Sequence, residues 1–467
     1  MNSTNGTGDA TETASVGWVS PPNAGRSTWG IIWSCLTIFL LCSWKCTHLN
    51  IPTVEESEAG WHHVWCIPVF PEKPLLRKWD RKLFFMGLSA IAPEMVVSLA
   101  AKQHFKARQE MQRVNNTNSK NKKYTLAHAM FAEMGGFVVH FYGETPQELG
   151  ADTSIIDEAG NDDFARRMKA VAKFDKGKMF IKKAQILDLS QVAKLESIGS
   201  FNVDEADIKD RSKADPFTKV FALVQASWLV LQSCARKAAG LQITELELMT
   251  LAFTVCALFT YILWWHKPFD VERSIVVLLP ESCIRVLEKE PEWKKPSWPS
   301  QWDHFQRSLS QWDHFQWSQR IVDLDWDTFE AVTTSFGLDS GEEESYHIIG
   351  TVAFYVFGAV FSSIHFAAWN WVFPLPVLQT IWQSFCAAAF GSAILPLVFG
   401  GLFSKLRTNY DGPDIVVIIL VNLFFGTLVI NMIARLALIV LTFYCFTSMP
   451  ASAYQDLDWA QFLPHFS

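Results

Sequence analysis

The apolar stretch IVVIILVNLFFGTLVINMIARLALIVLTFYCFT (Ile415–Thr447) is long enough to cross a lipid bilayer, and it carries Arg435 inside it. A second apolar stretch, FFMGLSAIAPEMVVSLAA (Phe84–Ala101), carries Glu94 beside Pro93. A charge at membrane depth costs about 2.5–3.5 kcal/mol on insertion scales, so it usually faces a cavity or a partner. The two stretches therefore predict a polytopic membrane protein with a polar site buried in its helix bundle.

The composition supports a membrane protein with a sizeable polar part. Apolar residues make up 49% of the 467 residues, with 36 Phe and 20 Trp, and Trp is typical of membrane interfaces. Charged residues make up only 19%, below the roughly 25% of soluble domains. The net charge of −7 argues against nucleic acid as a partner. The cysteines lack the Cys-x-x-Cys and Cys/His spacings of a zinc site, so we expect no metal and no cofactor.

The hydrophobic pattern predicts an all-α fold, a polytopic transmembrane helical bundle of seven or eight spans with two polar extramembrane loops. Pro93 should kink its helix in mid-membrane and free a backbone carbonyl near Glu94. The last stretch exceeds one bilayer crossing by about a third, so it is either one long helix or two segments broken near Asn431–Arg435. The expected spans are residues 29–44, 84–101, 217–234, 247–265, 348–371, 376–403 and 415–447.

The stretch Tyr124–Tyr142 is the eighth candidate, and its place is open. It is apolar but contains His128, Glu133 and His140. It is a span, a re-entrant hairpin broken at Gly135–Gly136, or an interfacial helix. The strongly basic segment before it favours the cytosol for that side of the membrane, by the positive-inside rule.

The chain divides into membrane regions separated by polar loops. The second loop is Trp-rich and contains SQWDHFQ twice, at residues 300–306 and 310–316. Two copies are too few for a repeat fold, so a local duplication explains them. The predicted division is a disordered polar N-terminus (1–27), membrane region 1 (28–142), a soluble loop or subdomain (143–214), membrane region 2 (215–266), the Trp-rich loop (267–347), membrane region 3 (348–450) and a C-terminal tail (451–467).

Several motifs follow one another in an order and spacing that resemble a large, mostly uncharacterised family of fungal multi-pass membrane proteins. The resemblance covers most of the chain from about Trp29 to the end. The motifs include RKLFFMGLSAIAPEMV (Arg81–Val96), LAHAMFAEMGGFVV (Leu126–Val139), GLQITELELMTLAFT (Gly240–Thr254) and FGAVFSSIHFAAWNWVFP (Phe357–Pro374).

The few characterised relatives in that family resemble membrane-bound terpene cyclases of fungal meroterpenoid clusters, such as the ascofuranone-pathway cyclase. The resemblance implies an enzyme of secondary metabolism that cyclises an epoxidised or unsaturated prenyl chain. The chain departs from the family pattern at Gln242, where many members have Pro, and near Leu441, where they have an acidic residue. If that acid matters to the family's chemistry, this chain lacks it.

Such a cyclisation needs a proton donor and a dry aromatic cavity. A carboxylic acid kept neutral by apolar surroundings supplies the proton. Ring faces stabilise the carbocation by about 0.5–2 kcal/mol each. The predicted catalytic residues are Glu94, Glu133 and His365, of which His365 would orient the acid or take the terminating proton. The predicted substrate-binding residues are Trp264, Trp265, Trp369 and Arg435.

Each of these residues also has a structural interpretation. Glu94 can be the partner of Arg435 across the bundle, because lone charges in a membrane usually pair. Glu133 can lie at an interface, and His365 can be a hydrogen-bonded histidine of the bundle. The tryptophans at span ends are typical anchors of the aromatic belt. The acids of Glu245–Glu247 indicate the first turn of a helix.

The leading functional prediction is a membrane-embedded terpene cyclase, an isomerase without a redox cofactor, in the endoplasmic reticulum membrane. Its partners would be a lipophilic small-molecule substrate, the lipid bilayer and other enzymes of its pathway. The alternative is a channel, transporter or receptor-like protein, in which the buried charges form a permeation or gating site. A third interpretation is a scaffold whose two polar loops bind partners.

Overall fold

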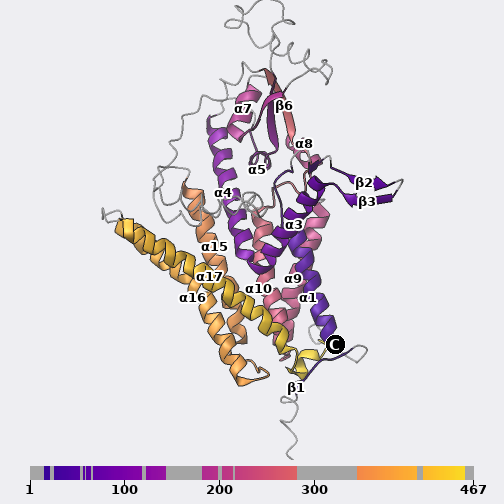
Figure 1. Cartoon of the computed structure of the whole chain (residues 1–467), viewed down its shortest axis with the longest axis vertical. Helices are drawn as coiled ribbons and strands as arrows, with labels where there is room; N and C mark the ends of the chain where they lie inside the picture. The colour runs from indigo at the N-terminus through magenta and orange to yellow at the C-terminus, as the bar shows by residue number, and fades with distance from the viewer. Residues whose placement is uncertain are drawn as a thin grey trace, which may run out of the picture.

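The computed structural model is mostly helical, with long helices gathered in one bundle and a smaller mixed subdomain at one end (Figure 1). The described residues hold eleven α-helices and several short strands. The all-α prediction is therefore incomplete, because these strands form three small sheets. The structure describes residues 15–20, 26–52, 56–57, 59–64, 67–117, 123–142, 181–197, 202–213, 216–280, 344–407 and 414–457.

Five helices are long and apolar enough to cross a membrane, and they make the chain an integral membrane protein. Over the residues that the structure describes, the number rises to six if one bent pair is counted as a span, against the seven or eight that the sequence predicts. The last helix is continuous, which removes the alternative of two broken segments. The five helices are α1 (Thr28–Cys46), α10 (Glu245–Leu263), α15 (Glu344–His365), α16 (Pro376–Arg407) and α17 (Asp414–Cys445).

The bent pair is α3 (Lys73–Ile91) and α4 (Pro93–Thr117), whose axes meet at 111°. Pro93 has no backbone N–H and its ring clashes with a preceding helical turn, so the chain breaks where the sequence predicts a kink. Lys82 of α3 lies over the ring of Trp44 at the end of α1. Nδ1 of His104 on α4 forms a hydrogen bond with the backbone carbonyl of Leu263, the last residue of α10. The middle of each helix therefore lies where α1 and α10 end, and α4 continues beyond that level into the subdomain (Figure 1).

α9 (Pro216–Ala238) and α10 form a helical hairpin at one end of the bundle. The turn between them contains Gly240, whose φ of 72° favours glycine. Thr244 begins α10 with a reciprocal cap: its hydroxyl accepts from the N–H of Glu247, and the Glu247 carboxylate accepts from the N–H of Thr244. This confirms the helix start that the acidic residues of the sequence indicate.

Both ends of the described chain meet at this same end of the bundle. β1 (Ser15–Val16) pairs antiparallel with β7 (Met449–Pro450), and the short helix η4 (Ala451–Tyr454) follows directly. Arg26 forms an ion pair with Glu247 of α10. The N-terminal segment is thereby fixed to both α10 and the segment after α17.

The subdomain at the opposite end packs three short helices and a sheet around the outer half of α4. The sheet has the order β5-β4-β6, in which β4 pairs antiparallel with β5 and parallel with β6. The elements are α5 (Leu126–Glu133), α7 (Leu189–Ser197), α8 (Glu205–Arg211), β4 (Phe137–Tyr142), β5 (Ile181–Ile186) and β6 (Ile275–Pro280).

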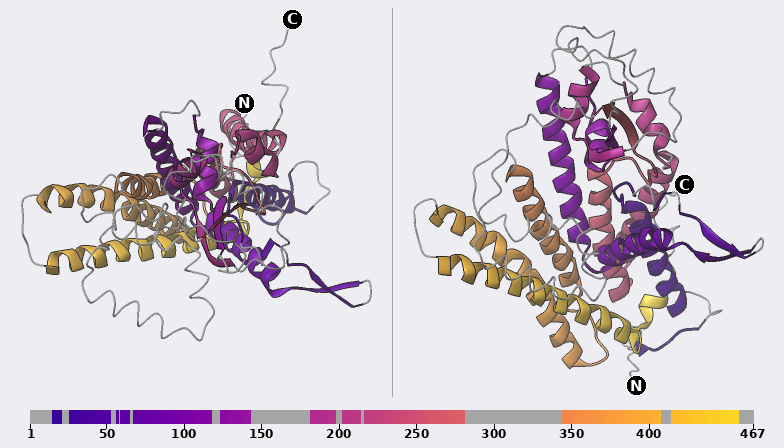
Figure 2. Two further views of the ribbon diagram at one scale, coloured as in Figure 1. Left: turned by 90° about the horizontal axis from the view of Figure 1, so that it is seen from above. Right: turned by 45° about the horizontal axis from the view of Figure 1, so that its top comes forward.

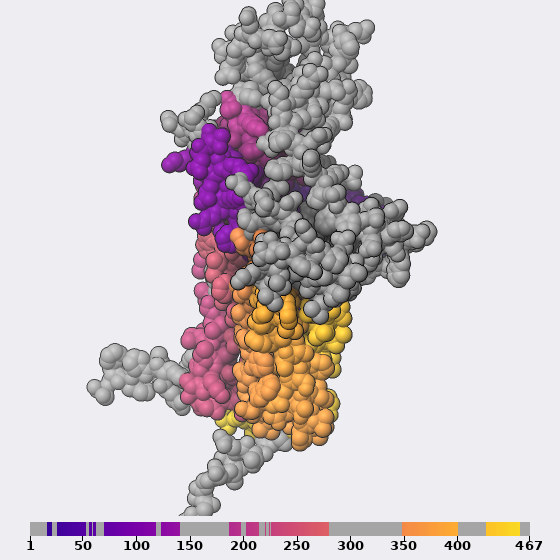
Figure 3. Space-filling model, turned by 90° about the vertical axis from the view of Figure 1, so that its left-hand side faces the viewer, coloured from indigo at the N-terminus to yellow at the C-terminus, as the bar shows by residue number. Residues whose placement is uncertain are grey.

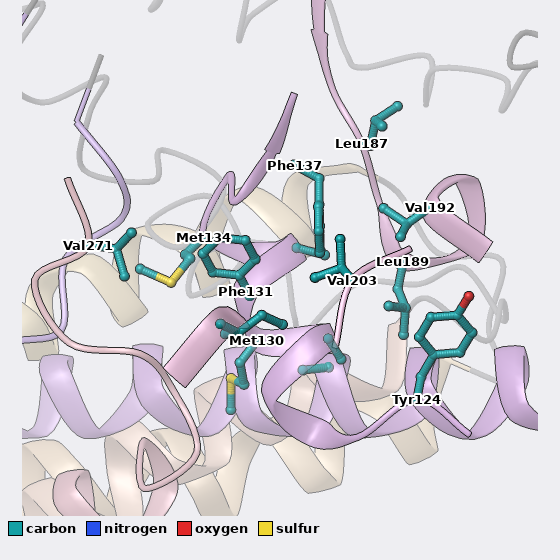
Figure 4. Close-up of a cluster of buried hydrophobic side chains, with 14 of the residues drawn as sticks. Tyr124, Met130, Phe131, Met134, Phe137, Leu187, Leu189, Val192, Val203 and Val271 are labelled. Atoms are coloured by element: carbon teal, nitrogen blue, oxygen red, sulfur yellow. The ribbon is translucent and has the colours of Figure 1, made fainter. Parts of the chain in front are cut away.

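The core of this subdomain explains why the stretch Tyr124–Tyr142 is not a span. Met130 and Phe131 of α5 are fully buried with Phe137 of β4 and Leu189 of α7 (Figure 4). The stretch folds as one short helix, a turn at Gly135–Gly136 and a strand, so it is not one continuous span. Its apolar residues serve a protein core instead of a lipid contact.

Two hairpins extend from the bundle. The first is made of α16 and α17, which lie antiparallel and lean away from the other helices (Figure 2). They lie on the side opposite the second hairpin, which two strands form. The orange surface of α15 and α16 forms one outer face of the bundle (Figure 3). The short helix η3 (Phe366–Ala368) connects these two helices. The strand hairpin is made of β2 (Trp61–Val64) and β3 (Ile67–Pro71).

Candidate functional site

A buried ion pair joins the helix break to α17. Arg435 Nη1 lies 2.7 Å from Glu94 Oε2, and each side chain is only 2% exposed. The same nitrogen donates to the carbonyl of Ile91 at 3.1 Å. The guanidinium lies 4.2 Å from the ring centre of Phe361 on α15. The structure thus brings two of the predicted site residues into direct contact.

The helix break creates an acceptor that Arg435 uses. The N–H of Met95, which would bond Ile91 in a continuous helix, bonds Ala92 at 3.0 Å. The Ile91 carbonyl is therefore available to Arg435. Glu94 stands in the first turn of α4, where the helix dipole also favours a negative charge.

Polar atoms without a described hydrogen-bond partner gather around this ion pair. They are Nε and Nη2 of Arg435, Oδ1 of Asn431, Oγ of Ser362 and Nε2 of His365. Asn431 stands one helical turn before Arg435, and Ser362 stands three residues before His365. Such atoms are costly to bury unsatisfied, so each is a candidate for a hydrogen bond to water or to the polar end of a ligand.

His365 is fully buried, and its hydrogen bonds decide its tautomer. Nδ1 lies 2.8 Å from the carbonyl oxygen of Phe361. A carbonyl only accepts, so Nδ1 carries the proton and Nε2 carries a lone pair. The His365 ring lies 4.9 Å from that of Phe361 and 6.1 Å from that of Trp382. His365 and Arg435 therefore both lie against the Phe361 ring.

The three predicted tryptophans lie in different surroundings. Trp264 is 2% exposed, and its Nε1 donates to Gln103 Oε1 at 3.0 Å. Trp265 is 42% exposed and Trp369 37% exposed, as expected of belt anchors. Among the contacts that the structure describes, none joins one of these tryptophans to Arg435. A joint substrate site of these tryptophans with Arg435 stays a prediction.

Glu133 lies outside the bundle, at the end of α5 in the subdomain. Its carboxylate forms an ion pair with Lys106 of α4 at 2.9 Å, and the two side chains are 20% and 38% exposed. A partly exposed carboxylate paired with a lysine does not have the dry surroundings that the predicted proton donor needs. Glu133 and Glu94 are thus in separate sites.

A different carboxyl, Glu245, is buried without a cationic partner among the described residues. It is 3% exposed at the start of α10. Its neighbour Glu247 is equally buried but pairs with Arg26. The sequence interpretation of both acids as a helix start missed this difference. No local signal separates them, because the position of Arg26 is decided by the fold.

The structure shows no group of three or more His, Cys, Asp or Glu side chains placed to hold a metal ion, among the residues that it describes. The polar site consists instead of one ion pair, one imidazole and several hydrogen-bonding atoms. Such a set can bind a polar group and move a proton.

The comparisons with known proteins give a family but no activity. The chain matches the model of a family of unknown function, DUF8562, over residues 3–158 and 176–286. The chain belongs to this family. No curated protein and no solved structure matches it significantly. The DUF8562 match includes Glu94 and Glu245, whereas His365 and Arg435 lie beyond the matched residues.

Proposed function

We propose that the protein is a membrane-embedded cyclase of a lipophilic, prenylated substrate, in the endoplasmic reticulum membrane of a fungus. The single observation that carries this proposal is the tautomer of His365. Its protonated Nδ1 is fixed by the Phe361 carbonyl, which leaves a basic Nε2 in a fully buried position. Such a nitrogen can accept the proton that ends a carbocation cascade.

The surroundings of His365 suit a carbocation. Besides Phe361 and Trp382, the cluster contains Phe373, whose ring lies 5.6 Å from that of Trp382. Trp382 is fully buried and donates to the backbone carbonyl of His365 at 3.3 Å. Ring faces stabilise a nearby cation by about 0.5–2 kcal/mol each. The resemblance to terpene cyclases is a separate support for the proposal.

The proton donor in this proposal is Glu245 instead of Glu94. Protonation of Glu94 would remove the partner of the buried Arg435, and breaking such a pair costs about 3–5 kcal/mol. Glu245 has no described cation to hold its charge, and an unpaired charge is costly to bury. Leu248, three residues after Glu245 on α10, belongs to the same buried cluster as Trp382 and Phe373.

The proposed reaction conserves all atoms of the substrate. Glu245 gives its proton to an epoxide oxygen, and the carbon–oxygen bond breaks. The electrons of a neighbouring double bond then form the ring bond, and a carbon-bound proton leaves to His365 Nε2. The product is an isomer of the substrate, so the step needs no oxidant.

The test is an assay in yeast microsomes that contain the full chain. An epoxyfarnesyl-aromatic substrate should give a product of unchanged mass and new retention time. His365→Asn should lower turnover about 10²–10⁴-fold, the usual contribution of a general base. Ser363→Ala is the matched control, because Ser363 is exposed on the same helix. Full turnover in folded His365→Asn would overturn the role of His365.

A transporter is the second candidate, and the helix break favours it. Discontinuous helices with a charge at the break form substrate sites in many transporters. Glu94 stands at such a break, and Arg435 has two donor atoms without a described partner. Anion uptake into proteoliposomes that is lost in Arg435→Lys would support this candidate. The transporter would become the favoured candidate if folded wild-type protein converts no substrate.

A further inference from the structure

A small pocket opens between three segments of the chain, at the level where α1 and α10 end. The residues that follow α1 contribute Asn50, α3 contributes Lys78, Arg81 and Lys82, and the residues that follow α10 contribute Asp270. The lining therefore holds three cations and one carboxylate. A pocket of this charge attracts an anion.

Each of the three cations has a carboxylate partner, but two of these ion pairs are long. Lys78 lies 3.4 Å from Glu272, but Glu272 is shared with the closer Lys213. Lys82 lies 3.6 Å from Asp270, which is 39% exposed. Such long ion pairs between partly exposed side chains contribute little free energy.

Arg81 has the best-formed pair, 2.8 Å from Glu56. Its guanidinium is planar and has further N–H groups that can face a second anion.

A buried lysine, Lys267, adjoins the pocket through Asn50. Lys267 is 2% exposed, and its Nζ donates to Gln103 Oε1 at 2.8 Å and to Asn50 Oδ1 at 3.3 Å. No carboxylate of the described residues forms an ion pair with Lys267. Because the oxygen of the Asn50 amide accepts from Lys267, its NH₂ group remains a donor for an anion in the pocket.

The outer face of α3 is suited to lipid. Leu76, Trp79 and Leu83 are 48%, 43% and 62% exposed. Their spacing of three and four residues places them on one stripe of the helix. The basic residues of α3 lie on the other side, as in helices that lie at a bilayer surface. Trp44, 41% exposed and stacked with Lys82, marks the same level.

We propose that this pocket binds the phosphate of an anionic phospholipid in the leaflet where α1 and α10 end. The cations of α3 and the Asn50 amide contact the headgroup, and the apolar stripe of α3 lies along the acyl chains. A bound phosphate nearby favours the protonated form of the buried Lys267. The proposal is independent of the reaction proposed for the bundle.

The test is native mass spectrometry of the full chain in detergent, with equal amounts of dioleoyl phosphatidylserine and dioleoyl phosphatidylcholine. The protein should retain phosphatidylserine preferentially. Lys78→Met should weaken that retention about fivefold, as expected for one lysine at a lipid surface. Lys237→Met is the control, because Lys237 is exposed at the end of α9, at the opposite end of the bundle from the pocket. Arg81→Met is the second variant if Lys78→Met does not fold.

Three results would overturn the proposal. Equal retention of both lipids would show that the pocket does not select charge. Unchanged retention in a folded Lys78→Met or Arg81→Met variant would place the lipid elsewhere. Displacement of phosphatidylserine by an equal concentration of inorganic phosphate would show that the pocket takes a free anion instead of a lipid.

Discussion

Glu94 and Arg435 form an ion pair of 2.7 Å in which both side chains are 2% exposed. The pair connects the first turn of α4 to the middle of α17, while Arg435 also holds the carbonyl that the helix break leaves open. A buried pair of this kind gains little over apolar packing, but the loss of one member leaves an uncompensated charge. Removing one member of the pair should therefore cost far more stability than removing both.

The first prediction uses this asymmetry. Glu94→Leu and Arg435→Met, each alone, should lower the free energy of unfolding by about 3–5 kcal/mol. The double variant should recover most of that loss, because no charge then remains buried. Thermal unfolding in detergent measures all three. Glu205→Gln, which removes half of an exposed pair on α8, should change little. Additive losses in the double variant would contradict the prediction.

The second prediction concerns the pH dependence of stability. Burial lowers the pKa of Lys267 from 10.5 to about 7. Between these values the unfolded chain binds a proton that the folded chain does not. Stability should therefore rise with pH across this window, by at most about 1.4 kcal/mol per pH unit. Lys267→Met should remove this contribution.

The measurement for Lys267 is the unfolding temperature of wild type and Lys267→Met between about pH 7 and about pH 9, in one detergent. The unfolding temperature of Lys267→Met relative to wild type should be highest at the lower pH, and this difference should shrink as the pH rises. Lys237→Met is the control, because Lys237 is exposed. A constant difference between wild type and Lys267→Met would show that Lys267 does not titrate in this range.

The sequence predicted the bundle better than the subdomain, for a physical reason. A span such as α10 is a local property, since its length and hydropathy alone identify it. The stretch Tyr124–Tyr142 is apolar for another reason, namely burial in a protein core. The pairing of β4 with β6 joins Phe137 to Ile275, and no local pattern reports a partner so distant in sequence.

The same distinction applies to the site. The contact of Glu94 with Arg435 was one of two alternatives that the sequence left open, because an isolated buried charge needs a partner. Glu245 was missed, since the sequence treats it and Glu247 alike. Only the position of Arg26, more than two hundred residues away, leaves one of them without a cation.

The third prediction concerns Gly136, at the turn between α5 and β4. Its N–H donates to the carbonyl of Phe131 at 2.7 Å, and a Cβ added there would collide with that carbonyl and with the Phe131 ring. Gly136→Ala should lower the free energy of unfolding by about 1–3 kcal/mol or more, the cost of overpacking a core. Gly87→Ala is the control, because nothing lies within 4 Å of its added Cβ. An unchanged unfolding temperature in Gly136→Ala would contradict this packing.

The fourth prediction rests on Arg236, which is 1% exposed near the end of α9. Its guanidinium donates to four backbone carbonyls: one in the turn before α10, and three in the segment after α17. The acceptors are Gln242, Ser452, Ala453 and Gln455, at 2.9–3.3 Å. Arg236 therefore holds the C-terminal segment against the α9–α10 turn.

Arg236→Lys should release that segment, because a single ammonium cannot reach carbonyls on both sides as the planar fork does. Hydrogen bonds from a charged group contribute about 1.5–3 kcal/mol each, so the loss should exceed that of a surface substitution. The sensitive measurement is chymotrypsin cleavage after Tyr454, which is 8% exposed in the intact fold. Cleavage should accelerate in Arg236→Lys and stay at the wild-type rate in Lys237→Met, the exposed neighbour. Equal rates in all three proteins would mean that other contacts, such as the pairing of β1 with β7, hold the segment.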